Sequence, residues 1–220
     1  MLRFLVLSAA LLAVPVAAHA QQTDRQLWLQ TNGSTQIAKD TRVTLESIGR
    51  FGDAAGGFSH AELGALFTRA IAKGVEIGIG YRHVEDWDHG DVLPNEERLR
   101  QQVVFTLGGG VMTRLRLEQR FNSRGGPVGV RIRPQLRYAL PLAAKGPSLF
   151  VSHEDFFNFN DTGWGQRSGY ERTRNAIGLS VPLSQHVTTD IGYLNQYRFG
   201  RDGGRDKMDH ALTMALAITL

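Results

Sequence analysis

Apolar side chains occupy every second position along most of the chain from residue 41 onward. Ile77 and Ile79, for example, alternate with Glu76 and Gly78. This period of two is that of a β-strand whose two faces differ, and the spacing typical of an amphipathic helix hardly occurs. The pattern predicts an all-β chain with about ten strands of roughly 11 to 14 residues each.

The expected strand lengths and connections favour a membrane barrel over a soluble one. Strands of soluble proteins usually have about five or six residues, whereas a tilted membrane crossing needs about 9 to 11. Short and long connections also alternate, as they do in outer-membrane barrels. We expect tight turns at residues 72–74, 108–110 and 182–186, and longer polar connections at 85–96, 158–170 and 200–207. These features predict a transmembrane, antiparallel, up-and-down β-barrel.

Aromatic residues gather where the expected strands meet the longer connections. Outer-membrane barrels carry such rings of aromatic side chains at the membrane interface. The expected ring comprises Phe51, Phe58, Tyr81, Phe121, Phe156, Phe157, Tyr170, Tyr197 and Phe199.

The number of strands depends on how residues 21–40 are interpreted. Closed single-chain bacterial barrels have even strand numbers and both termini on the periplasmic side. Residues 41–52 then form the first of ten strands, and residues 21–40 form a periplasmic or lumen-lying segment. However, the sequence LWLQTNGSTQI also resembles a strand, which would make eleven strands, or twelve if one more strand is hidden. We therefore predict one barrel domain over residues 21–220 with ten strands, and twelve strands as the alternative.

The first twenty residues have the features of a cleaved secretion signal. Arg3 precedes an apolar run, and Ala18-His19-Ala20 forms a small-residue cleavage site. The run contains Pro15 and is shorter than the roughly 20 residues of a membrane-spanning helix. Together with the barrel pattern, this signal predicts export to the outer membrane of a Gram-negative bacterium.

Several segments carry a resemblance to a known family. The order NEERLRQQVVF, RLRLEQRF, RIRPQLRY, VSHEDFF, RNAIGLSV and IGYLNQY, after an early LWLQ, resembles bacterial outer-membrane β-barrels catalogued as a domain of unknown function. The resemblance covers nearly all of the chain after the signal. It implies location and architecture, and it implies no activity.

The polar faces of the expected strands carry many charges, most of them arginine. The 25 basic residues comprise 21 arginines and 4 lysines. The charges expected to face the lumen are Arg42, Glu46, Arg50, Glu62, Glu76, Arg82, Arg98, Arg100, Arg114, Arg116, Glu118, Arg120, Arg131, Arg133, Arg137, Glu154, Arg172, Arg174, Asp190 and Arg198. Guanidinium groups stay charged and bridge carboxylates in a planar fork. The pattern therefore predicts either a salt-bridged structural lumen or a narrow passage that prefers small anions.

Other functions have weaker support in the sequence. The chain has no cysteine, which excludes disulfides, thiolate metal sites and cysteine nucleophiles. His83, Asp88 and His89 are weak metal candidates because their spacing matches no known site, and we expect no metal or cofactor. Ser152, His153 and Glu154 alternate between faces, so they form no nucleophile–base pair and we identify no catalytic residue. A barrel enzyme that hydrolyses lipid or peptide is the alternative function.

The expected partners follow from the predicted location. They are outer-membrane lipid and lipopolysaccharide, the machinery that assembles outer-membrane proteins, and small anions. The formal net charge of +4 does not indicate nucleic-acid binding.

Overall fold

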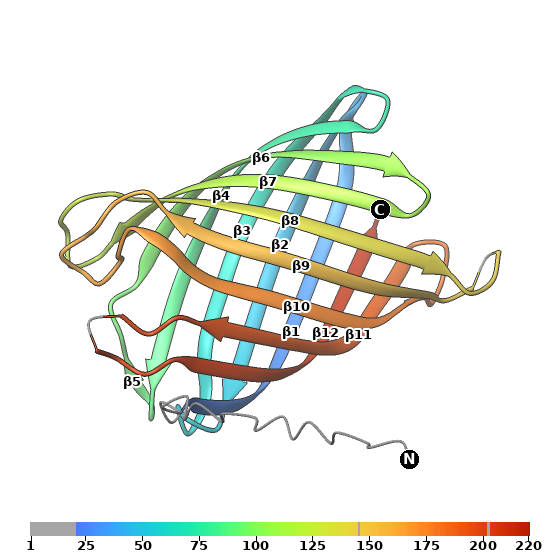
Figure 1. Ribbon diagram of the computed structural model, residues 1–220. Coiled ribbons are helices and arrows are strands. Elements are labelled where there is room, and N and C mark those ends of the chain that lie inside the picture. Colours follow the sequence, from blue (N-terminus) through green and yellow to red (C-terminus); the bar gives the residue numbers. More distant parts are fainter. Residues whose placement is uncertain (1–20, 145, 202) are drawn as a thin grey trace, which may run out of the picture.

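A computed structural model describes residues 21–144, 146–201 and 203–220, and the predicted signal, residues 1–20, lies outside them. Eleven long strands form a closed barrel (Figure 1). They are β1 (Gln22–Ala38), β2 (Thr41–Gly52), β3 (Gly57–Ala72), β4 (Val75–Asp88), β6 (Glu96–Gly108), β7 (Val111–Asn122), β8 (Gly129–Pro141), β9 (Ser148–Asn158), β10 (Gly169–Pro182), β11 (Val187–Arg198) and β12 (Lys207–Thr219). The two-residue strand β5 (Asp91–Val92) pairs with β4 outside the barrel sheet. The all-β barrel is confirmed.

The barrel has one strand more than the ten predicted and one fewer than the alternative of twelve. The additional strand is β1, which forms in the segment that the sequence left open. Successive long strands form antiparallel pairs, so with an odd number of strands the first and the last run in the same direction. β1 and β12 therefore close the barrel as a parallel pair, starting with Gln22 beside Lys207. The start of β1 and the end of β12 lie at opposite ends of the barrel, and the expectation of an even strand number with both termini at one end is wrong here (Figure 1).

The connections differ in length between the two ends of the barrel. At one end, here called the turn end, residues 39–40, 73–74, 109–110, 142–147 and 183–186 join the strands. At the other, the loop end, the connections are residues 53–56, 89–95, 123–128, 159–168 and 199–206. The predicted segregation of tight turns and longer connections is confirmed. The connection after β4 is shorter than predicted because residues 85–88 continue β4 and Glu96 begins β6.

Apolar and charged side chains are distributed in the opposite way to those of a soluble domain. Each of the eleven long strands presents at least one large apolar side chain to the outside. Leu45 on β2, for example, is 65% exposed. Charged side chains occupy the inside, where Arg100 is 0% and Glu118 is 1% exposed. The part of the chain that the structure describes has no helix long and apolar enough to cross a membrane.

Aromatic side chains form two outward clusters at the loop end. Phe58 contacts Phe51 and Trp87, with ring centroids 5.2 and 4.8 Å away. Tyr170 lies between Phe157 and Phe199, at 4.8 and 4.9 Å. The expected place of Phe156 in this ring is wrong. It is 1% exposed and lies inside the barrel, because neighbouring residues of a strand face opposite sides and Phe157 faces outward.

Close contact between two strands makes Gly178 sensitive to substitution. A Cβ atom there would lie 2.4 Å from the Ile191 carbonyl oxygen and 2.9 Å from the Phe150 ring. We expect Gly178→Ala to lower the free energy of unfolding by about 1–3 kcal/mol, because the paired backbone cannot move away. Urea unfolding of the refolded protein measures this. Gly33→Ala is the control, since a Cβ atom at Gly33 meets nothing within 4 Å. Equal stabilities of the two variants would contradict the expected clash.

Candidate functional site

The interior of the barrel contains a charged cavity of about 550 Å³. Of the twenty predicted lumen charges, these sixteen line it: Glu46, Arg50, Glu62, Arg82, Arg98, Arg114, Arg116, Arg120, Arg131, Arg133, Arg137, Glu154, Arg172, Arg174, Asp190 and Arg198. Arg100 and Glu118 are buried against these residues. Arg42 and Glu76 form a half-exposed ion pair of 2.9 Å instead. The alternation of the strands thus brings the predicted charges together.

Three carboxylates organise the middle of the interior. Glu154 on β9 forms ion pairs with Arg133 on β8 at 2.9 Å, Arg114 on β7 at 2.7 Å and Arg174 on β10 at 3.7 Å. Glu118 accepts hydrogen bonds from Arg131 and Arg133 at 2.6 and 2.7 Å. Glu154 therefore connects β9 with β7, β8 and β10, and Glu118 connects β7 with β8.

The third carboxylate is Glu46 on β2. Arg82 on β4 donates to it at 2.8 Å, and Arg100 on β6 donates to the same oxygen. Because these strands are not all neighbours in the sheet, the contacts join separate parts of the wall.

A second group of ion pairs lies nearer the loop end. Glu62 pairs with Arg50 at 3.2 Å and with Arg82, and it hydrogen-bonds to the Nε2 atom of His60 at 2.7 Å. The Nδ1 atom of the same imidazole lies 2.5 Å from Asp86. The histidine thus bridges two carboxylates on adjacent strands.

Four acidic residues in this interior were not among the predicted lumen charges. Glu96 pairs with Arg120 at 2.6 Å, and Asp86 also lines the cavity. Glu171 pairs with Arg131 at 3.2 Å, and Asp209 pairs with Arg198 at 2.7 Å. With these four, ten acidic groups face the fourteen arginines. The predicted set of fourteen arginines and six acidic residues has eight more positive than negative charges, and these four residues reduce the excess to four.

Aromatic rings also lie inside, beneath the guanidinium groups. The Arg50 guanidinium carbon is 3.9 Å from the Trp28 ring centroid, and that of Arg137 is 3.9 Å from the Phe150 centroid. Arg133 stacks at 4.4 Å on Phe156. Such cation–π contacts add favourable electrostatic energy where a cation is shielded from water. Local periodicity does not predict these contacts, because an inward aromatic residue breaks the alternation of polar and apolar side chains.

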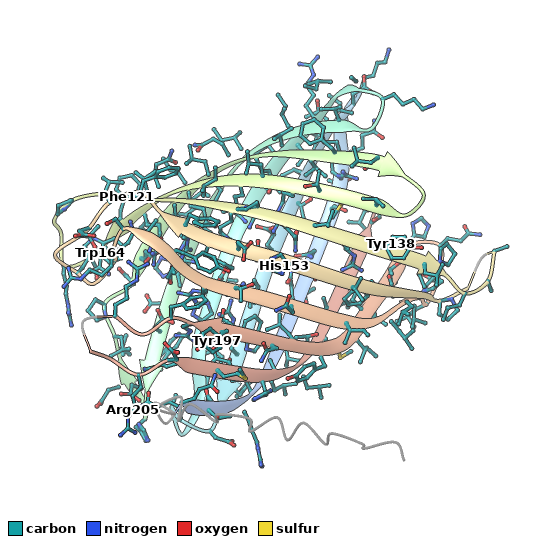
Figure 2. All side chains as sticks on the ribbon, viewed as in Figure 1. Phe121, Tyr138, His153, Trp164, Tyr197 and Arg205 are labelled. Carbon is teal, nitrogen blue, oxygen red and sulfur yellow. The ribbon has the colours of Figure 1, made fainter. Side chains whose placement is uncertain are left out.

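The loop of residues 159–168, which carries Trp164, lies at the loop end of the barrel (Figure 2). Arg120 donates to Gln166 Oε1 at 2.9 Å and lies 5.0 Å from the Trp164 ring centroid. The backbone N–H of Ser168 donates to Asp161 at 2.6 Å, and this bond lowers the pKa of the exposed carboxyl group. The loop is therefore stabilised by a hydrogen bond within it and by its contacts with Arg120 of the barrel.

The three weak metal candidates do not form one site. His83 hydrogen-bonds to Glu85 and Glu97 at 2.9 and 2.7 Å, whereas His89 bonds to its neighbour Asp88 at 2.8 Å. Within residues 21–144, 146–201 and 203–220, no three histidine, cysteine, aspartate or glutamate side chains form a group that could hold a metal ion.

A row of polar side chains lies on the outer wall, which is otherwise largely apolar. His153, Asn175, Asn195 and His210 are successive partners across β9, β10, β11 and β12. His153 bonds to Asn175 at 2.8 Å and to Asp155 at 3.0 Å, and it lines an outer groove of about 380 Å³. Its neighbour Glu154 faces the interior, as the alternation predicted.

Comparison with known proteins adds two findings. A family model described as a protein of unknown function (DUF2490) matches residues 25–208. An uncharacterized protein of Methylorubrum extorquens is 33% identical over 223 residues, which cover 98% of this chain and 97% of that protein.

Proposed function

The chain belongs to the DUF2490 family, and from the chemistry of its barrel we propose that it is an outer-membrane protein with a narrow, anion-preferring passage. Its surroundings would be outer-membrane lipid and lipopolysaccharide, and the outer-membrane assembly machinery would insert it.

The outer surface supports the proposed location. A wall of exposed apolar side chains suits contact with acyl chains, and the aromatic clusters at the loop end suit the lipid interface. The predicted secretion signal fits the same location.

The excess of arginine around the cavity is the main observation that supports an anion-preferring passage. Positive groups that surround a confined volume raise the local concentration of anions and repel cations. The ion pairs also hold the wall together, so a structural role and a passage share the same residues.

Single-channel conductance of the refolded protein in a planar bilayer tests the passage. Under a salt gradient, we expect a reversal potential that shows anion preference. Arg174→Gln removes a cavity-lining charge and should weaken the preference, whereas Arg205→Gln removes an exposed charge in a loop and should not.

Cation preference would contradict the proposal. So would a bilayer that contains folded protein and passes no current.

The outer groove favours a second candidate, a barrel enzyme that hydrolyses lipid or peptide. His153 is held in this groove by the carboxylate of Asp155 and the amide of Asn175, and a hydrolase would use this imidazole as its general base once a substrate displaces one of them. Release of fatty acid or of a cleaved peptide by the refolded protein, lost in His153→Ala, would support it. No turnover by the wild-type protein would rule it out for the substrate tested.

A further inference from the structure

Arg116 on β7 is unusual among the arginines of the interior. It is 5% exposed, lines the cavity, and donates through Nε and Nη2 to one atom, Gln102 Oε1, at 3.1 and 2.7 Å. Among the described residues, it is the one of the fourteen lumen arginines with no carboxylate within 4.0 Å. A buried charge without a counter-charge is costly, so an anion in the cavity would stabilise it.

The neighbours of Arg116 increase this cost. Arg133 lies directly opposite it on β8, Arg114 lies two residues before it on the same strand, and Arg100 lies on β6. All three guanidinium groups repel that of Arg116. Like charges opposite each other in a sheet destabilise the pairing.

The nearest carboxylates are already engaged. Glu118 binds Arg131 and Arg133, and Glu154 binds Arg114 and Arg133. The Nε atoms of Arg100, Arg114 and Arg133 are also buried without an acceptor. Among the described residues, these three buried N–H groups therefore have no acceptor.

We propose that Arg116, together with Arg114 and Arg133, which line the same cavity, binds the phosphate group of a small solute. A phosphate offers several charged oxygens in a tetrahedral arrangement, which suits donors that come from different strands, and arginine binds phosphate through two parallel hydrogen bonds. A single carboxylate offers only one planar pair of oxygens. The cavity of about 550 Å³ leaves room for the rest of a phosphomonoester. The inference rests on the proposed entry of anions into the barrel.

Calorimetric titration of the refolded full-length mature protein in detergent micelles with inorganic phosphate at low salt tests this site. We expect saturable binding by the wild-type protein. In Arg116→Gln, the affinity should fall about tenfold or more, the effect of losing charge-assisted hydrogen bonds. Arg205→Gln removes an exposed arginine and should bind phosphate as the wild-type protein does.

Stability without phosphate distinguishes a binding role from a structural one. Because the substitution relieves repulsion, Arg116→Gln should unfold at the same urea concentration as the wild-type protein or at a higher one. Phosphate should raise the stability of the wild-type protein alone. Absence of phosphate binding by the wild-type protein, or equal binding by Arg116→Gln, would overturn the proposal.

Two further probes identify the source of the phosphate group. Glycerol 3-phosphate represents a soluble phosphomonoester, and dihexanoyl phosphatidic acid represents a lipid headgroup. We expect glycerol 3-phosphate to compete with inorganic phosphate, because charged side chains dominate the lining of the cavity and suit a soluble solute better than acyl chains. Competition by the lipid alone would overturn the assignment to a soluble solute.

The same variants separate this inference from the proposed passage. Phosphate binding in micelles without current in bilayers would contradict the passage and support the site. Anion-selective current that is unchanged by phosphate, with no binding in micelles, would support the passage and overturn the site.

Discussion

Replacement of Glu154 by glutamine is expected to lower the free energy of unfolding by about 3–5 kcal/mol, the usual cost of removing one partner from a buried ionic cluster. Glu154 is 5% exposed and is the shared counter-charge of Arg114, Arg133 and Arg174. Without its charge, three guanidinium groups from three strands repel one another in the middle of the barrel. The effect should appear as a lower urea midpoint for unfolding of the refolded protein.

Glu76→Gln is the matched control, because it makes the same chemical change in an exposed pair. Glu76 contacts Arg42 at 2.9 Å, and both side chains are more than one-third exposed. Exposed pairs contribute about 0–1 kcal/mol, so this variant should unfold almost as the wild-type protein does. Equal losses in the two variants would mean that the central cluster does not hold the strands together.

The alternation in the sequence predicts the inner face well for a physical reason. Successive side chains of a strand point to opposite sides, so the register of a strand fixes which residues face inward. Arg131 and Arg133, two residues apart, accordingly reach the same carboxylate, Glu118. The same argument correctly separates His153 from Glu154.

The missed residues lie where this signal is weak. The expectation of an even strand number excluded β1 from the ten-strand barrel, although its sequence resembles a strand. Its alternation is also weak, because Trp28 faces inward among polar residues while Thr31 and Gly33 follow on the outer face. Glu96 was missed because it lies at the very start of its strand, within a segment that composition marked as a loop. Ion pairs between strands that are not neighbours, such as that of Arg137 with Asp190, depend on the order and register of the strands. The periodicity of a single strand carries no information about either.

Substitution of Ile79 by arginine is expected to separate a membrane barrel from a soluble one. Ile79 is 58% exposed on the outer wall of β4, and its partners across the sheet, Phe67 and Gln101, carry no negative charge. If lipid surrounds this wall, the arginine loses its hydration and should cost about 2–4 kcal/mol when the protein is unfolded from vesicles. If water surrounds it, the change should stay within about 0.5 kcal/mol, as for most surface substitutions.

Leu142→Arg is the control for this measurement. Leu142 is also 58% exposed, but it lies just beyond the end of β8 at the turn end of the barrel. Near the membrane interface, the cost of arginine falls to about 0–1 kcal/mol, so depth alone distinguishes the two variants. A large loss at Ile79 and a small one at Leu142 would support the outer-membrane location. Small losses at both positions would contradict it, since the exposed apolar wall would then face water.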